Sequence, residues 1–178
     1  MKFKMILAAD VNAGIGKEAN LPWRLPADLA HFRRLTTGNN KNAVFMGRTT
    51  WESIPVKFRP LRNRVNFVLS TTMDDKSDAC KVVRSLDQLA KEVGENEFDS
   101  VWCIGGATLY SSLLKSGQID EVYLTRVLGD FDCDVKLDGL YETLKRDFKL
   151  QSGAENKENM FGQVQRQNGV DFVFEHYA

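Results

Sequence analysis

The stretch Asn20-Leu-Pro-Trp-Arg-Leu-Pro-Ala-Asp-Leu-Ala-His-Phe-Arg-Arg-Leu-Thr36 decides how this chain is organised. Pro26 suits the first position of a helix, because a proline has no N–H and none is needed there. Within the predicted helix, Asp28, Phe32 and Leu35 recur at spacings of four and three and therefore share one face. The pattern places a carboxylate on the face that we expect to be buried.

This helix alone leaves two interpretations of Asp28 open. Acidic residues are common in the first turn of a helix, where they complement the macrodipole. A buried carboxylate has a raised pKa and needs hydrogen-bond donors, which a ligand can supply. The first interpretation is the more common one, and the rest of the chain has to decide between them.

Length and composition indicate one domain over residues 1–178 with a hydrophobic core, since 43% of the 178 residues are hydrophobic. Lysine and arginine total 24 and so do aspartate and glutamate, which argues against nucleic acid or an anionic membrane as the main partner. No apolar run approaches the roughly 20 residues of a membrane span. The start of the chain lacks the pattern of a secretory signal, so we expect a cytoplasmic protein.

Cysteines and histidines are few. Cys80, Cys103 and Cys133 are odd in number and widely spaced, which is typical of reduced cytosolic thiols. With only His31 and His176, we predict no metal site and no histidine-based triad. We expect His31 on the helix surface and His176 at the end of a strand.

Strand-like and helical segments alternate along the chain, which predicts a mostly parallel α/β sheet. Asn168-Gly169 is a strong turn signal and predicts a C-terminal antiparallel hairpin. The predicted strands are Lys2–Asp10, Ala43–Met46, Val65–Leu69, Lys81–Val83, Val101–Ile104 and Ile119–Val127, and two further predicted helices are Ser85–Val93 and Ala107–Leu114.

Three strand-to-helix junctions carry residues suited to an anion. Gly47-Arg48, Ser70-Thr71-Thr72 and Gly105-Gly106 each follow a predicted strand, and ligands of such sheets bind beyond the carboxyl ends of the strands. Thr49 and Glu52 match a capping box and predict a helix start there. We therefore expect a phosphate-bearing cofactor along this edge, with Asp28 facing a separate pocket.

Gly14-Ile-Gly16 does not fit a dinucleotide fingerprint, because no third glycine follows and no helix opens directly. A mobile loop between the first strand and the first helix explains these glycines better.

Taken together, the chain resembles the dihydrofolate reductases. The matching motifs, in order, are Gly-Ile-Gly-Lys and Leu-Pro-Trp at 14–23, Leu-Pro-Ala-Asp-Leu-Ala-His-Phe at 25–32, Met-Gly-Arg-Thr-Thr-Trp-Glu-Ser-Ile-Pro at 46–55, Arg-Pro-Leu at 59–61, Ile-Gly-Gly-Ala at 104–107, Tyr-Leu-Thr-Arg at 123–126 and Asp-Phe-Asp-Cys-Asp at 130–134. The resemblance implies a single domain with a twisted eight-stranded sheet. It also implies reduction of 7,8-dihydrofolate to tetrahydrofolate by hydride transfer from NADPH, which supports one-carbon metabolism and thymidylate and purine synthesis.

The resemblance also implies the catalytic roles. Asp28 would be the acid that binds the pterin and favours protonation at N5 before hydride reaches C6. Thr125 would be its hydroxyl partner, Trp23 would lie beside it, and the loop Gly14–Trp23 would close over the nicotinamide. The implied partners are dihydrofolate and antifolate inhibitors, bound by a monomer.

Two sets of binding residues follow from the same resemblance. The substrate would contact Ile6, Leu7, Ala8, Asp28, Leu29, Phe32, Ile54, Leu61, Ile104 and Thr125, with Arg64 holding the α-carboxylate of its glutamate. NADPH would contact Ala8, Ile15, Gly16, Gly47, Arg48, Thr49, Thr50, Leu69, Ser70, Thr71, Arg84, Ile104, Gly105, Gly106, Ala107, Thr108, Leu109 and Tyr110.

Two positions depart from the family pattern. Thr71 replaces an arginine that many members direct at the 2′-phosphate of the cofactor, so discrimination against NADH is expected to be weaker. Asp134-Val-Lys-Leu replaces the common Asp-Thr-Phe-Phe-Pro, so the kinetics of the loop that closes the site are expected to differ.

Two alternatives remain at this point. A related reductase of riboflavin synthesis, acting on a pyrimidine riboside phosphate, explains the cofactor edge but not Asp28 together with Arg64. A non-catalytic module that binds pterins or nucleotides predicts a missing acid or a broken loop. Binding of folate analogues discriminates the first alternative.

Overall fold

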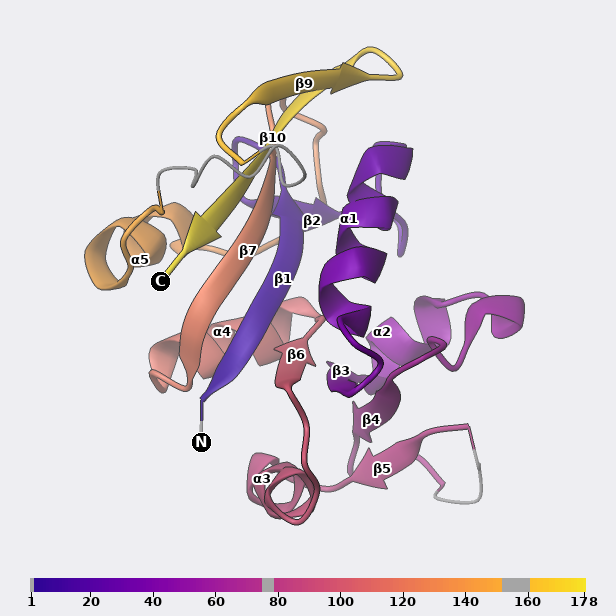
Figure 1. The fold of residues 1–178 in the computed structure, drawn as a ribbon. Helices are drawn as coiled ribbons and strands as arrows, with labels where there is room; N and C mark the ends of the chain where they lie inside the picture. The colour runs from indigo at the N-terminus through magenta and orange to yellow at the C-terminus, as the bar shows by residue number, and fades with distance from the viewer. Residues whose placement is uncertain (1, 75–78, 152–160) are drawn as a thin grey trace.

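An eight-stranded sheet runs through the molecule in a computed structural model, which describes residues 2–74, 79–151 and 161–178 (Figure 1). The strand order is β5-β4-β3-β6-β1-β7-β10-β9, and every pair from β5 to β7 is parallel. The bounds are β1 Phe3–Ala9, β3 Asn42–Gly47, β4 Val65–Leu69, β5 Lys81–Val83, β6 Ser100–Cys103, β7 Ile119–Val127, β9 Val164–Gln167 and β10 Val170–Tyr177. The predicted mostly parallel eight-stranded sheet is confirmed.

The antiparallel part of the sheet is the hairpin β9–β10 at one end, which turns at Asn168-Gly169 as predicted. Strand β10 pairs with β7 over Phe172–Tyr177, so the C-terminal segment lies beside the strand that carries Thr125. Both residues of the turn have positive φ, 51° at Asn168 and 76° at Gly169. Asparagine and glycine tolerate this conformation better than other residues, so the turn forms where the sequence predicts it.

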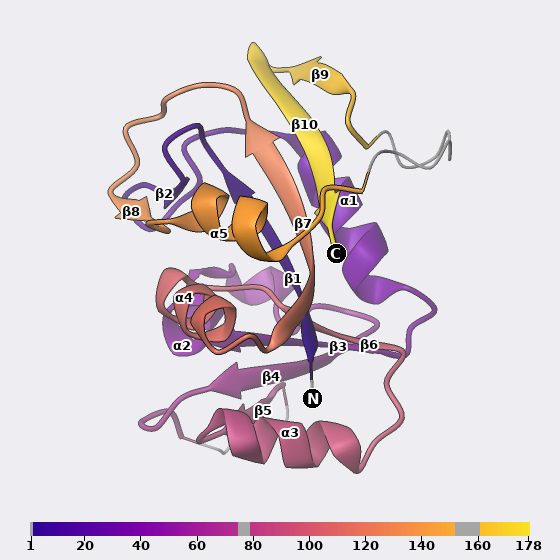
Figure 2. The same cartoon turned by 90° about the vertical axis from the view of Figure 1, so that its left-hand side faces the viewer.

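Helices cover both faces of the sheet. Figure 2 shows α1 on one side and α4 and α5 on the other. The helices are α1 Pro26–Thr37, α2 Arg48–Ser53, α3 Leu86–Gly94, α4 Ala107–Lys115 and α5 Leu140–Asp147, with a 3-10 turn η1 at Val56–Phe58. Pro26 occupies the first turn of α1, as predicted. Ser85 caps α3 by accepting a hydrogen bond from the Gln88 amide.

The alternation of strand side chains divides the core into two layers. In β1, Met5, Leu7 and Ala9 pack into the layer beneath α3, α4 and α5. Ile6 packs into the opposite layer, where α1 and α2 lie. The face of the sheet that packs against α1 is therefore made of alternate residues of the central strands.

Two local expectations were wrong. Helix α2 starts at Arg48 after Gly47 and has no side-chain cap, so Thr49 and Glu52 form no capping box. Glu52 instead accepts a hydrogen bond from Arg48 Nε at 2.7 Å, one helical turn away. His31 is buried rather than on the helix surface, because β10 packs against α1 and Phe174 stacks on the imidazole at 3.9 Å.

One helix and two short strands were not predicted from the sequence. No helix was expected at α5, although Leu140 and Leu144 are spaced by four and both are buried in the core. Strands β2 (Gly14–Gly16) and β8 (Val135–Lys136) form a separate two-stranded ribbon. Segments of two or three residues have no readable period, so this ribbon is visible only in the structure.

Candidate active site

Asp28 of α1 and Thr125 of β7 are in direct contact between the helix and the sheet. The Thr125 hydroxyl donates a hydrogen bond to Asp28 Oδ1 at 2.5 Å. Burial raises the pKa of Asp28 above its ordinary value of 3.8, and the Thr125 hydroxyl opposes this rise. Among the described residues, no lysine, arginine or histidine forms an ion pair with Asp28. The carboxylate can therefore accept further hydrogen bonds from a ligand.

Apolar side chains surround this pair. Ile6 lies in the core layer of the α1 face, and most of the predicted substrate contacts pack against the same layer, namely Phe32, Ile54, Leu61 and Ile104. Ala8 packs beside Trp23 in a neighbouring cluster. The Leu7 side chain points into the opposite layer, so only its backbone faces the cleft. Leu29 is 62% exposed.

Trp23 is 6% exposed and packs edge-on against Phe131 at 5.3 Å. Its indole Nε1 is one of the buried polar atoms without a hydrogen-bond partner among the described residues. An unpaired buried N–H is unfavourable, so this atom is suited to a water or a ligand acceptor.

Arg64 lies at the other end of α1, at the edge of the cleft. Its guanidinium donates to the Thr36 hydroxyl and, through Nε, to the Arg62 carbonyl at 3.0 Å. Burial and the charge of Arg33 lower the pKa of Arg64 to about 10. No carboxylate forms an ion pair with Arg64 in the described part of the chain. Two nearby cations without an anion between them favour an anionic ligand.

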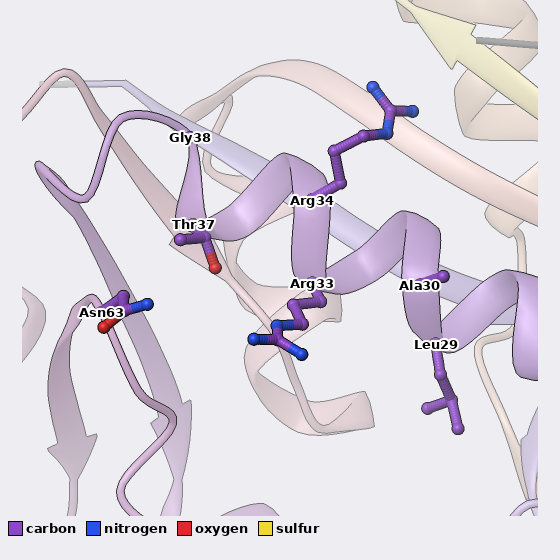
Figure 3. Close-up of a pocket in the computed structure, with 7 residues that line it drawn as sticks. All are labelled: Leu29, Ala30, Arg33, Arg34, Thr37, Gly38 and Asn63. Atoms are coloured by element: carbon purple, nitrogen blue, oxygen red, sulfur yellow. The ribbon is translucent and has the colours of Figure 1, made fainter. Parts of the chain in front are cut away.

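A surface hollow next to Arg64 extends this positive region. Figure 3 shows Leu29 and Arg33 projecting from one side of α1, toward the side where the Asn63 loop lies, whereas Arg34 projects the other way. The residues of α1 that line the hollow include the apolar Leu29 and Ala30 and the basic Arg33 and Arg34. Thr36, which sequence reasoning missed, is spaced by eight from Asp28, so the helical period was the signal that would have found it.

The strand ends at Gly47, Ser70 and Gly105 share one edge of the sheet, because β4, β3 and β6 are adjacent and parallel. Whether a cofactor binds there stays a prediction. Gly47 N–H donates to the Gly105 carbonyl at 2.8 Å, which joins the ends of β3 and β6. A Cβ at Gly106 would lie 3.2 Å from the Thr50 hydroxyl, and one at Gly105 would lie 3.3 Å from the Tyr110 hydroxyl. Glycine therefore suits both positions at the start of α4, because a Cβ would crowd the hydroxyls of Thr50 and Tyr110.

The rest of this edge is divided between core and surface. Leu109 and Tyr110 are buried, and the Tyr110 hydroxyl donates to the Ile6 carbonyl at 2.8 Å. Ile15 and Leu69 pack against the same core layer. Thr49 and Thr108 are exposed, whereas Gly16, Thr50 and Ala107 are partly buried.

Two guanidinium groups converge on the turn after β4. Arg84 NH1 donates to the carbonyls of Ser70 at 2.7 Å and Met73 at 2.8 Å. Arg48 NH1 donates to the Thr72 hydroxyl at 3.1 Å. Thr71 is exposed between them. This turn is thus the most basic part of the cofactor edge and is suited to a phosphate.

The loop Gly14–Trp23 is tied to the segment 130–136. Strand β2 pairs with β8, with Gly14 opposite Lys136. Lys17 forms an ion pair with Asp132 at 3.0 Å, and Glu18 N–H donates to Asp134 Oδ2 at 2.9 Å. Although Val-Lys-Leu follows Asp134, this contact between the two loops is present.

Comparisons with known proteins agree with this geometry. Residues 2–178 match the family model described as dihydrofolate reductase. A putative dihydrofolate reductase of Caenorhabditis elegans is 38% identical, over 97% of this chain and 94% of its own length. The dihydrofolate reductase of Heliothis virescens is 33% identical, over 99% of this chain and 97% of its own length. The solved structure of Schistosoma mansoni dihydrofolate reductase superposes with a TM-score of 0.80 at 34% identity, covering 99% of this chain and 97% of that one.

Three observations indicate the same family. They are a buried acid among apolar side chains, a glycine-lined edge of the sheet, and a match to the family model across nearly the whole chain. The chain belongs to the dihydrofolate reductase family, oxidoreductases that reduce dihydrofolate to tetrahydrofolate with a nicotinamide cofactor.

Proposed function

We propose that this enzyme uses NADPH and that Asp28 is the acid that binds and activates dihydrofolate. The observation that carries the proposal is the Asp28–Thr125 pair, because a buried carboxylate with no cationic partner in the described part of the chain needs donors from a ligand. The 2-amino group and adjacent ring N–H of a pterin are two such donors. The cofactor, when bound, supplies a hydride to C6 of the substrate.

The role of Asp28 is to orient the pterin and to favour a proton on N5. Its negative charge lies in an apolar environment, where it stabilises a developing positive charge on the ring more strongly than in water. The Thr125 hydroxyl fixes the orientation of the carboxylate through the 2.5 Å hydrogen bond to Oδ1. Trp23 Nε1, which lacks a partner among the described residues, is suited to hold the water that delivers the proton.

Arg64 is proposed to hold the α-carboxylate of the substrate's glutamate. A planar guanidinium pairs with a carboxylate through two parallel hydrogen bonds, and this one has no carboxylate partner among the described residues. The apolar side chains between Asp28 and Arg64 would contact the pterin and benzoyl rings, with Leu29 at the exposed edge.

The residues of the cofactor edge fit NADPH. The Gly105-Gly106 backbone at the start of α4 is the proposed contact of the pyrophosphate, and the turn at Ser70–Thr72 lies between the guanidinium groups of Arg48 and Arg84. These two arginines are the proposed contacts of the 2′-phosphate. Thr71 carries no charge, so we expect the preference for NADPH over NADH to be weaker than an additional arginine would give.

The first experiment follows the oxidation of NADPH with dihydrofolate in the parent and in Asp28→Asn, and repeats it with NADH. We expect kcat/KM of Asp28→Asn to fall by about 10²- to 10⁴-fold, the usual contribution of a positioned acid or base. Asp138→Asn, at an exposed acid ahead of α5, is the matched control and should keep parental activity. Parental turnover in folded Asp28→Asn would refute the role of Asp28, and an inactive parent would refute the reaction.

The same proposal covers the setting in which the enzyme works. We propose that residues 1–178 form one domain that acts as a cytoplasmic monomer and supports one-carbon metabolism. The structure supports a single domain, because the three clusters of buried residues are all built on one sheet. No helix in the described ranges is long and apolar enough to span a bilayer. Sedimentation of the purified protein tests the monomer directly.

A further inference from the structure

Asp10 is a completely buried carboxylate that the proposed mechanism does not use. It follows the last residue of β1, at the base of the loop Gly14–Trp23, and its exposure is 0%. No lysine or arginine within the described ranges forms an ion pair with it. A carboxylate in this position depends on uncharged donors for its stability.

The donors to Asp10 come from both loops that flank the cofactor site. Oδ1 accepts from the amides of Asn12 at 2.9 Å and Gly14 at 2.8 Å, which belong to the base of the first loop. Oδ2 accepts from the amide of Phe131 at 3.2 Å, in the segment that carries β8. Burial and the Asp10 charge raise the pKa of the Cys133 thiol, which therefore keeps its proton as a hydrogen-bond donor to Asp10.

The packing around Gly14 makes this contact sensitive to loop position. A Cβ on Gly14 would lie 2.5 Å from Cys133 Cβ and 2.9 Å from Asp10 Oδ1, so only a bare backbone fits. The Tyr141 hydroxyl from α5 donates to the Asp10 carbonyl and fixes the backbone from the other side. The loop therefore cannot shift at Gly14 without lengthening bonds to the carboxylate.

We propose that Asp10 is a positioning residue for hydride transfer: it joins the base of the Gly14–Trp23 loop to the 129–133 segment and thereby holds Ile15 against the nicotinamide site. This inference rests on the proposed function, since Ile15 is placed near the nicotinamide there. Without the carboxylate, the amides of Asn12, Gly14 and Phe131 lose their shared acceptor. The loop then samples open conformations that admit water, and the fraction of complexes competent for hydride transfer falls.

The test measures single-turnover hydride transfer from NADPH and from its 4-deuterated form, together with the Kd of dihydrofolate and the thermal unfolding midpoint. In Asp10→Ala we expect hydride transfer to slow by about tenfold, as when a loop that closes an active site loses its anchoring hydrogen bonds. We expect a retained isotope effect and a Kd for dihydrofolate within about twofold of the parent. Asp10→Asn keeps one acceptor oxygen, so its hydride transfer should lie between these values.

Tyr141→Phe is the matched control, because it removes a hydrogen bond to the backbone of Asp10 and leaves the carboxylate in place. It should lower the unfolding midpoint without slowing hydride transfer. Equal slowing in Tyr141→Phe, or parental hydride transfer in either folded Asp10 variant, would overturn the inference. If Asp10→Ala does not fold, Asp10→Asn decides the question by the same rates. A parent that fails to oxidise NADPH with dihydrofolate refutes the proposed function instead, so the two failures are distinguishable.

Discussion

Replacing Asp28 by asparagine should abolish most of the activity and at the same time stabilise the ligand-free protein. Burial raises the pKa of Asp28 above 3.8, so its ionised form is less stable in the folded than in the unfolded chain. Each unit of this rise costs about 1.4 kcal/mol of folding free energy at neutral pH. An asparagine keeps an oxygen that accepts the Thr125 hydroxyl but carries no charge.

The expected gain can be converted into a temperature and a pH profile. Asp28→Asn should therefore unfold at a higher temperature than the parent at pH 7, by about 2–4 °C for each kcal/mol of folding free energy gained in a chain of this size. Between pH 3.8 and the raised folded pKa, the native state holds a proton that the unfolded state releases. The stability of the parent relative to Asp28→Asn therefore falls as pH rises through this window and is constant above it.

Thermal unfolding of both proteins between pH 3 and pH 8, without ligands, measures this difference. Asp138→Asn controls for removing an exposed carboxylate and should leave the pH profile unchanged. The reasoning is refuted if Asp28→Asn is less stable than the parent at pH 7, or if the two curves stay parallel across the whole range. Saturating dihydrofolate should stabilise the parent more than the variant, because the ligand supplies the donors that Asp28 lacks.

Three further predictions concern single side chains. Arg64→Leu should raise the KM for dihydrofolate about 10- to 150-fold with little change in kcat, since a charged hydrogen bond worth about 1.5–3 kcal/mol acts on ground and transition states alike. Arg62→Leu is the control at an exposed arginine. A lower kcat at unchanged KM in Arg64→Leu would contradict the assignment. Burial and the Arg34 charge lower the pKa of His31 to about 4. The unfolding free energy of the parent should therefore fall by up to about 3 kcal/mol as pH falls from 6.5 to 4, and that of His31→Phe should not show this loss. The same pH dependence of the denaturant midpoint in both proteins would contradict this. Burial raises the pKa of Cys103 to about 12, so an aromatic disulfide reagent at pH 8 should label it only after unfolding, and native labelling would show that β6 opens.

The candidate site was largely predictable because its residues lie at regular positions of regular elements. Asp28 is on the buried face of a helix that the proline at position 26 starts, and helical spacing alone brings it near Phe32 and Thr36. Gly47, Ser70 and Gly105 follow parallel strands, whose carboxyl ends share one edge of the sheet. The hydrogen-bond partner of Asp28, Thr125, was predicted only from the family resemblance, since nothing in the local sequence connects the two residues.

Side-chain environment was harder to predict than element position. Leu7 and Leu29 stay predicted substrate contacts, but the sequence did not show that the Leu7 side chain packs into the opposite core layer or that Leu29 is 62% exposed. His31 was predicted to be a surface residue, but it is buried because β10 packs against α1. These outcomes depend on which face of an element its neighbours cover, and a single sequence does not contain that information.

By itself, the sequence determined the local structure: the start of α1, the parallel strands, the turn at Asn168-Gly169 and the glycines at the strand-to-helix junctions. Each of these follows from backbone freedom or from the periodicity of apolar residues, which act over a few residues. Only the tertiary structure decided the contacts between distant segments. The hydrogen bond of Thr125 to Asp28 joins residues 97 positions apart, and those of Asp10 reach across 121 positions to Phe131. Such contacts form only when sheet order and register bring the segments together.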